Sequence, residues 1–125
     1  MGPLEQRRTI REGMGAAIVE HVATNLLHLS VRTLLESISL PCSTILRRIK
    51  RGERLSAYES DRIARVLFVL GHAGEVLASV ELAAEWMQRG NAMLGGLRPL
   101  EMLDSQPGYD RVRTLLLRVA HGVTA

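Results

Sequence analysis

The strongest chemical signal in this sequence is a cluster of five basic residues: Arg47, Arg48, Lys50, Arg51 and Arg54. Glu53 is the single acidic residue among them. Clustered guanidinium and ammonium groups neutralise nucleic-acid phosphates and release their counterions. The same cluster can also be the solvated outer face of a helix. Which of the two interpretations applies depends on the helix that carries these residues and on the elements beside it.

The other candidates for chemistry do not form a catalytic or metal-binding set. His21 and His28 lie seven residues apart, and two imidazoles alone make a poor metal site. Cys42 falls at an apolar position, where a small core residue is expected, and a lone cysteine excludes an internal disulfide. No serine or histidine stands in a triad-like setting. We therefore expect a binding protein that is not an enzyme and that holds no cofactor or metal.

Apolar residues at helical spacing predict three helices in the first half of the chain. The first carries apolar positions from Ile18 to Leu29 at steps of three and four residues. Ser30 is placed to cap a short second helix at its N-terminus. Pro41 can open a third helix, for which Gly52 is the expected C-terminal stop. Two short helices separated by a tight turn have the layout of a helix-turn-helix.

The third helix divides into an apolar and a polar face. Its polar face is predicted to contact DNA, with the first three residues near bases and the others near phosphates: Ser43, Thr44, Arg47, Arg48, Lys50 and Arg51. The expected core of the motif consists of Val31, Leu34, Leu35, Ile38, Leu40, Ile45, Leu46 and Ile49. Ser39 stands where such turns often have glycine, and Pro41 lacks a backbone N–H. The alternative is an ordinary helical hairpin with a solvated face.

Helical patterns continue through the second half. Ser56 and Glu59 form a capping box ahead of a helix that buries Ile63, Val66, Leu67 and Leu70. Ser79 can cap a further helix, on which Trp86 is expected to pack into the core. Turn residues between Leu94 and Leu100 precede a last helix, which starts near Pro107 and stops at Gly122. No segment alternates with period two, so the chain is predicted to be all-α.

Composition supports one small helical protein. The chain has 125 residues, of which 46% are hydrophobic and only 3% aromatic. The net charge is +3, and the basic excess lies in residues 1–55, which hold nine basic and five acidic residues. No apolar run approaches the roughly 20 residues of a membrane helix. We expect a soluble, cytoplasmic protein with a flexible arm at 1–13, a helix-turn-helix region at 14–54 and a second region at 55–125.

The second region resembles the toxin-binding domain of the Xre/MbcA/ParS antitoxins. The resemblance covers roughly residues 53–125 and is most specific in Asn-x-x-Leu-Gly-Gly-x-x-Pro-Leu-x-x-Leu, which begins at Asn91. The matching stretches are 55–62, 85–87, 91–103 and 118–125. The helix-turn-helix at 14–54 is similar to the degenerate motif that precedes this domain in the family. The resemblance implies a helical toxin-binding domain packed against an N-terminal helix-turn-helix.

The resemblance also implies a function. Such antitoxins pair with RES-domain toxins, which consume NAD or transfer ADP-ribose, and their C-terminal end covers the NAD cleft. The free carboxylate of such a tail suits a cleft that holds pyrophosphate. Autorepression of the operon by a DNA-binding dimer is the second implied activity. The residues expected to contact the toxin are Arg98, Arg118, His121, Gly122, Val123, Thr124 and Ala125.

Two alternatives remain open at this point. One is a stand-alone transcriptional regulator whose second half only dimerises. The other is an antitoxin that does not bind DNA, with a solvated basic face. Arg98 is also ambiguous, since it can contact the toxin or cap a neighbouring helix.

Overall fold

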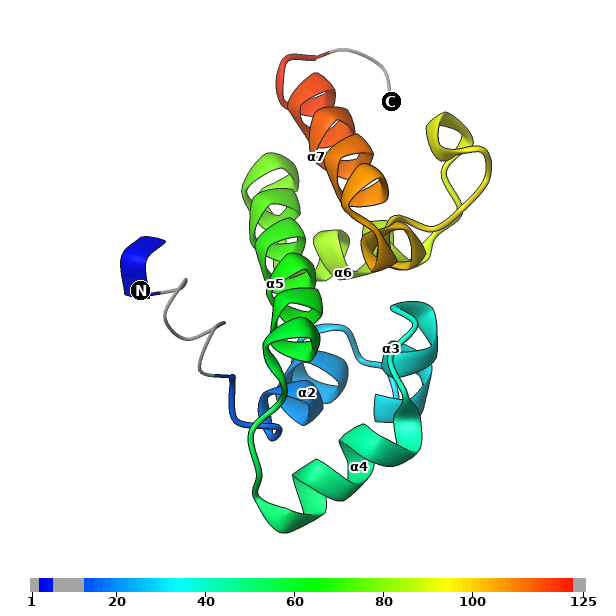
Figure 1. The fold of residues 1–125 in the computed structure, drawn as a ribbon. Coiled ribbons are helices and arrows are strands. Elements are labelled where there is room, and N and C mark those ends of the chain that lie inside the picture. The colour runs from blue at the N-terminus through cyan, green and yellow to red at the C-terminus, as the bar shows by residue number, and fades with distance from the viewer. Residues whose placement is uncertain (1–2, 6–12, 123–125) are drawn as a thin grey trace. The chain divides into compact units, whose positions relative to one another are not determined.

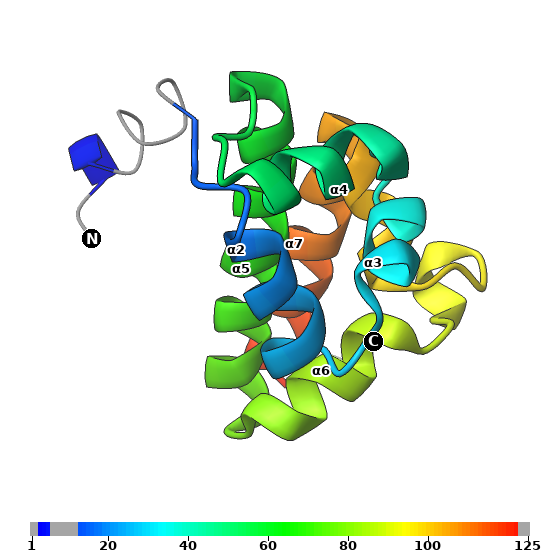
Figure 2. The same cartoon turned by 90° about the horizontal axis from the view of Figure 1, so that it is seen from below.

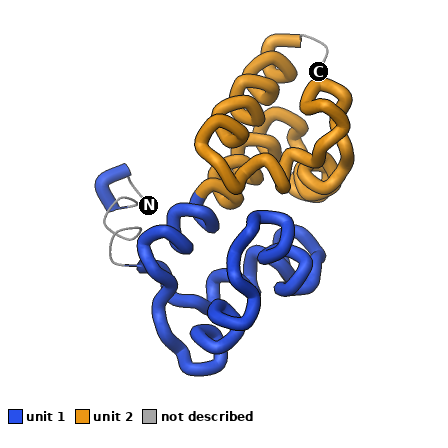
Figure 3. The backbone as a smooth tube through the Cα atoms, turned by 45° about the vertical axis from the view of Figure 1, so that its right-hand side comes forward, with its two compact units in different colours: residues 1–64 blue, residues 65–125 orange. Residues whose placement is uncertain are grey.

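The computed structural model describes residues 3–5 and 13–122, and these are almost entirely helical, as the sequence predicts (Figures 1 and 2). Within those ranges, the β-type pairing is limited to one isolated bridge between Gly15 and Arg54. The chain divides into two compact units, residues 1–64 and 65–125 (Figure 3). The division falls inside helix α5 (Ala57–Leu77), ten residues after the boundary expected from sequence.

The first helix predicted from the sequence is wider and shorter in the structure than its pattern indicates. Helix α2 (Ile18–Glu20) continues as the π-helical segment η1 (His21–Leu26), in which Leu27 N donates to Val22 O at 3.0 Å. The π turn shifts the buried face, so Leu27 is buried and Leu26 only half-buried. His28 then takes a φ of 57°, and the helix ends before Leu29.

Helices α3 (Val31–Ser37) and α4 (Cys42–Arg51) follow, joined by a short turn at which the chain changes direction (Figure 2). Ser30 Oγ accepts from Thr33 N at 3.1 Å, which confirms the predicted cap. Ser39 adopts a φ of 58°, the left-handed conformation for which such turns usually carry glycine. Leu40 is buried, and its N–H donates to Leu35 O at 2.9 Å. The turn thus forms without glycine, at the cost of a non-glycine residue at positive φ.

Most of the core expected for this motif is confirmed. Leu34, Leu35, Ile38, Leu40 and Ile45 are buried. Val31 and Ile49 are half-buried, and Cys42, expected in the core, is also half-buried. The prediction was wrong for Leu46, which is 37% exposed although it follows the buried Ile45. Leu46 lies about 100° around the helix from Ile45, on a side of α4 that the described residues leave partly uncovered.

A short N-terminal segment is fastened to the connection between α4 and α5. Leu55 N donates to Met14 O at 2.7 Å, and Ala16 N donates to Glu53 O at 2.9 Å. Gly13 has a φ of 90°, and a Cβ there would lie 2.1 Å from Leu55 O. The C-terminal residue of the expected arm is therefore held by unit 1, whereas residues 1–2 and 6–12 lie outside the described part of the chain.

Unit 2 consists of the second part of α5 and four further helical elements: α6 (Val80–Gln88), η2 (Ala92–Leu94), η3 (Pro99–Asp104) and α7 (Gln106–Ala120). Ser79 Oγ caps α6 as predicted, and Ser105 Oγ caps α7 by accepting from Gly108 N at 3.1 Å. Helix α7 packs on η3 and lies beside the second part of α5 (Figure 1).

The core of unit 2 is aliphatic, with few aromatic contributions. Its buried apolar residues are Val66, Val69, Leu70, Ala73, Ala83, Ala84, Met87, Leu94, Leu100, Leu103, Val112, Leu115 and Leu116. Two residues expected in this core, Leu67 and Trp86, are half-buried instead. No helix in the described ranges is long and apolar enough to cross a membrane.

Candidate functional site

The polar face of α4 presents exposed hydroxyl and basic groups. Ser43, Arg47, Lys50 and Arg51 are exposed, while Thr44 is half-buried. Helix α4 contains no acidic residue between Cys42 and Arg51. Arg51 Nη1 lies 3.8 Å from Glu53 Oε1, but both side chains are well exposed, so this ion pair is weak and screened by salt. The face is thus accessible and strongly positive.

The end of α4 is fixed by a left-handed glycine. Gly52 has a φ of 65°. Its N–H donates to Ile49 O at 3.2 Å, and Glu53 N donates to Arg48 O at 2.9 Å. These two hydrogen bonds form a Schellman motif, which confirms Gly52 as the predicted stop.

Arg48 differs from the other predicted DNA contacts because its side chain is engaged within unit 1. Its Nε lies 3.3 Å from Glu59 Oε1, without the alignment of a hydrogen bond, and its Nη1 donates to Arg54 O at 3.3 Å. Glu59 is buried and also accepts from Ser56 N at 2.7 Å in the predicted capping box. Arg48 therefore ties the end of α4 to the start of α5.

A second internal arginine, Arg62 on α5, was not singled out from the sequence. It is buried, and its guanidinium donates to Ile38 O and to the Tyr58 hydroxyl. The Arg62 guanidinium also lies 4.7 Å from the centre of the Tyr58 ring. Ile38 O is an orphan carbonyl at the end of α3, where a cation is favoured. Arg62 thus supports the turn that sets the direction of α4.

In unit 2, Asn91 organises the loop that carries the family-like motif. Its Oδ1 accepts from Met93 N at 2.9 Å, and its backbone N–H donates to Leu97 O at 3.0 Å. Gly95 and Gly96 take φ values of 68° and 85°, the left-handed region that glycine adopts without strain, within the turn predicted between Leu94 and Leu100. The loop closes on itself and leaves Met93 and Leu97 43% and 48% exposed.

Arg98 is the N-cap residue of the neighbouring helical element, η3, which is one of the two roles left open for it by the sequence. Arg98 N donates to Glu101 Oε1 at 2.8 Å, and Arg98 Nη2 lies 3.5 Å from Glu101 Oε2. The hydrogen bond from the Arg98 backbone, followed by the Arg98 side chain, lowers the pKa of Glu101 despite some opposing desolvation. Part of the Arg98 guanidinium is therefore committed to Glu101.

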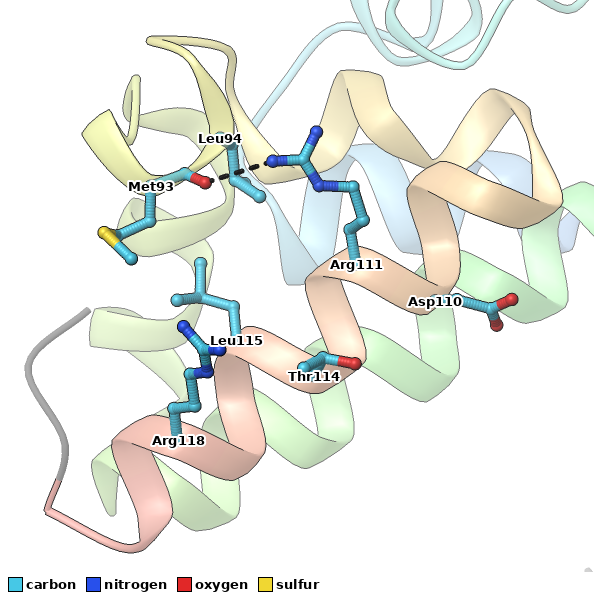
Figure 4. A pocket seen from close by; sticks show the side chains of 7 residues that line it. All are labelled: Met93, Leu94, Asp110, Arg111, Thr114, Leu115 and Arg118. Atoms are coloured by element: carbon cyan, nitrogen blue, oxygen red, sulfur yellow. Dashed lines mark hydrogen bonds between the residues drawn. The ribbon is translucent and has the colours of Figure 1, made fainter.

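A shallow pocket of about 320 Å³ lies between η2 and one face of α7 (Figure 4). Arg111 Nη2 donates to Met93 O at 3.3 Å across this pocket. Thr114 and Arg118 follow on the same face of α7. The full lining consists of Met93, Leu94, Asp110, Arg111, Thr114, Leu115 and Arg118. Of the predicted toxin contacts, the structure places Arg118 in this pocket.

The other predicted toxin contacts are distributed differently. Arg98 precedes η3 and does not line the pocket. His121 and Gly122 are exposed at the end of α7, where Gly122 takes a φ of 76°. Val123, Thr124 and Ala125 lie outside the described residues.

An arginine–aromatic cluster occupies another part of unit 2. Phe68 on α5 and Tyr109 on α7 meet edge to face, with ring centres 6.4 Å apart. Arg113 lies 5.2 Å from the centre of the Phe68 ring and 5.4 Å from that of Tyr109. These contacts join α5 to α7 at a surface where Phe68 is 48% exposed. Sequence reasoning did not identify this cluster, because its two helices are distant along the chain.

The described part of the chain contains no group of three or more His, Cys, Asp and Glu side chains that could hold a metal ion. His21 instead lies beside Asn25, with its Nδ1 2.9 Å from Asn25 Nδ2. The α4 face and the α7 pocket offer charged groups, hydrogen-bond donors and, on α7, an apolar wall.

Comparison with known proteins assigns both halves of the chain. Residues 5–67 match the antitoxin Xre-like helix-turn-helix domain, and residues 72–122 match the antitoxin Xre/MbcA/ParS C-terminal toxin-binding domain. The two matches meet within α5, close to the division between the compact units. The pocket of unit 2 lies within the second match.

Three curated proteins are similar to this chain. An antitoxin Xre of Pseudomonas putida is 32% identical over 80% of this chain and 65% of its own length. An antitoxin Xre of Photorhabdus laumondii is 30% identical over 93% of this chain and 78% of its own length. A Prs ADP-ribosylating antitoxin of a Sphingobium species is 20% identical over 98% of this chain and 82% of its own length. The chain thus spans slightly less than two thirds of the first relative, and it belongs to the Xre family of antitoxins.

Proposed function

We propose that this chain is the antitoxin of a type II toxin–antitoxin pair and binds a RES-domain toxin that consumes NAD or transfers ADP-ribose. It neutralises the toxin by covering the NAD cleft with its C-terminal end, and it represses its own operon through α4. It is not itself an enzyme. It acts in the cytoplasm, where it binds both the toxin and the operator DNA of its own operon. The observation that carries this proposal is that a helix-turn-helix match precedes a toxin-binding match on one chain.

Operator binding is supported by the charge and exposure of α4. In this proposal the exposed Ser43 and Arg47 contact bases, and the exposed Lys50 and Arg51 contact phosphates. Thr44 is half-buried and offers at most its hydroxyl. Arg48 contributes indirectly in this proposal, because its pairing with Glu59 holds α4 against α5. A dimer binds two half-sites with the symmetry common to helix-turn-helix proteins.

Toxin neutralisation is supported by the family match and by the end of α7. His121 and Gly122 are exposed, so the residues that follow α7 directly are accessible to a partner. The Sphingobium relative carries ADP-ribosylation in its name, which favours a toxin that uses NAD as a substrate. We propose that the segment from His121 to Ala125 covers the cleft, with Arg118 and Arg98 contacting its surroundings.

The test is co-expression with the product of the adjacent reading frame, with host growth and NAD content as readouts. The full-length chain is compared with a variant that lacks residues 122–125. A variant lacking residues 2–5 is the matched control, because it loses a terminal segment of equal length from the other unit. Complex formation is measured separately by size-exclusion chromatography, so that binding and protection are scored independently.

We expect the full-length chain and the control to protect the host, and the truncated chain to bind without protecting it. Equal protection by all three variants would overturn the role of the C-terminal segment and assign inhibition to the helical body. If none of them binds the neighbouring product, the chain acts instead as a stand-alone regulator whose second half dimerises.

A further inference from the structure

The pocket on α7 combines two cations with an apolar wall. Arg111, Thr114 and Arg118 follow one another at helical spacing along a single face of α7 (Figure 4). Met93, Leu94 and Leu115 form the apolar part of the lining, and Met93 is 43% exposed. At about 320 Å³ the pocket is at the small end of the range for ligand sites, which is roughly 300–1,000 Å³.

The positive charge in this pocket is not neutralised by the described part of the chain. Arg118 makes no hydrogen bond or ion pair there, and Arg111 uses one N–H on Met93 O. Among the described residues of the lining, Asp110 is the one carboxylate, and its Oδ1 accepts from Gln106 Nε2 at 3.0 Å. Two guanidinium groups therefore offer most of their donors to an incoming group, and Thr114 belongs to the same lining.

We propose that this pocket docks an aspartate or glutamate side chain of the toxin partner. The carboxylate accepts from Arg111, Arg118 and the Thr114 hydroxyl, while apolar atoms beside it on the toxin cover Met93 and Leu94. The inference rests on the proposed function, since it names how the toxin is held, but it concerns the body of unit 2 rather than its C-terminal end. Arginine and methionine are enriched at protein interfaces, which suits this composition.

Charge distribution favours an acidic protein surface over DNA at this site. Residues 65–125 contain six basic and six acidic residues, whereas residues 1–64 contain ten basic and seven acidic residues. The net positive field needed for phosphate binding is therefore concentrated in unit 1. The local excess on α7 instead provides two fixed cations beside an apolar wall, which is the arrangement for recognising a carboxylate anchor.

The test measures the affinity of the full-length chain for the purified toxin by titration calorimetry, in parallel with its affinity for operator DNA. Arg118→Glu is the principal variant, because within residues 13–122 this side chain has no hydrogen bond or ion pair to lose. Arg111→Glu is the second, and Arg89→Glu is the matched control, with the same charge change at an exposed site of unit 2 outside the pocket. Thermal melts followed by circular dichroism establish that each variant is folded.

We expect Arg118→Glu and Arg111→Glu each to weaken toxin binding by about tenfold or more, and Arg89→Glu to change it by less than about twofold. Operator binding should be unchanged in all three variants. Equal weakening by Arg89→Glu would overturn the docking site in favour of general charge attraction. Loss of operator binding with normal toxin binding would assign the pocket to DNA and also overturn it.

The result separates this inference from the function on which it rests. If the unaltered chain binds the toxin and both pocket variants bind it as tightly, the docking site is wrong and the proposed antitoxin function stands. If the unaltered chain does not bind the toxin, the antitoxin function fails and the docking site fails with it.

Discussion

Helices α4 and α7 both expose arginine, but the surroundings of those arginines differ. On α4, Arg47, Lys50 and Arg51 are exposed on a helix without acidic residues. On α7, Arg113 lies over two aromatic rings, and Arg111 and Arg118 border an apolar recess. The first surface is suited to phosphates and the second to a protein partner.

The difference shows that arginine content alone does not identify a partner. What distinguishes the two helices is what accompanies the charge: small hydroxyl side chains on α4, and methionine, leucine and aromatic side chains around α7. It also shows that some arginines are structural, since Arg48 and Arg62 are directed into unit 1. A substitution that destabilises one unit should therefore weaken binding at the arginine surface of that unit and leave binding at the other surface unchanged.

The largest effect is expected from Gly108→Ala at the start of α7. A Cβ at this buried position would lie 2.0 Å from Met102 O, and the backbone of η3 cannot yield cheaply. We expect a loss of about 3 kcal/mol in the free energy of unfolding, measured by urea denaturation. The affinity for the toxin should also decrease, because α7 can no longer pack in the same way on η3.

Gly71→Ala is the matched control for this change. Its Cβ meets nothing within 4 Å, and alanine in the middle of α5 should stabilise the chain by about 0.5–1 kcal/mol. If Gly108→Ala also abolishes operator binding while unit 1 remains folded, the arginine surfaces of α4 and α7 are not independent, and the contrast drawn between them is wrong.

The next largest effect is expected from Arg62→Met, which damages unit 1. Methionine fills part of the space but leaves Ile38 O without its buried donor, at a cost of about 2 kcal/mol. Operator affinity should fall at temperatures where the turn before α4 begins to open. Arg32→Met, an exposed change on α3, is the control and should alter the unfolding free energy by less than about 0.5 kcal/mol. An unchanged unfolding free energy for Arg62→Met would show that this contact does not support the turn.

A smaller effect is expected from Arg47→Ala combined with Lys50→Ala, which removes two exposed cations from α4. If both contact phosphates, the slope of log K against log salt for operator binding should decrease by about two units. Arg48→Ala should instead lower the unfolding free energy by about 1 kcal/mol and leave the slope nearly unchanged, because its charge is engaged with Glu59. Equal slopes for the double variant and the unaltered chain would remove α4 as the DNA-binding surface.

Local signals explain which features the sequence could predict. The caps at Ser30 and Ser79, the Ser56–Glu59 box and the Gly52 stop each involve residues within a few positions of one another. Their geometry follows from the chain itself, so the element boundaries near them were predicted well. The same holds for the turn predicted between Leu94 and Leu100, where Gly95 and Gly96 are consecutive left-handed residues.

Features that depend on distant residues were not predicted. Arg62 contacts a carbonyl 24 positions away, and Gly108 is required by the path of η3 rather than by its own helix. The π turn at His21–Leu26 moved Leu27 into the core, although the sequence pattern fits a regular helix. The pocket on α7 also needs η2 as its second wall, so its arginines could be recognised as a pair only once both elements were placed.

The smallest effect should come from Glu101, the residue that orders the start of η3. Because its pKa is lowered in the folded chain, chiefly by the hydrogen bond from Arg98 N, its contribution to stability is present above the ordinary value of 4.5. That contribution disappears as the pH falls through the lowered folded value. Urea denaturation between pH 3 and pH 7 should show Glu101→Gln less stable than the unaltered chain at neutral pH, with the gap closing in acid. A gap that stays constant down to pH 3 would mean that the carboxylate charge is immaterial, and that the η3 cap, unlike the two arginine surfaces, acts through hydrogen bonding alone.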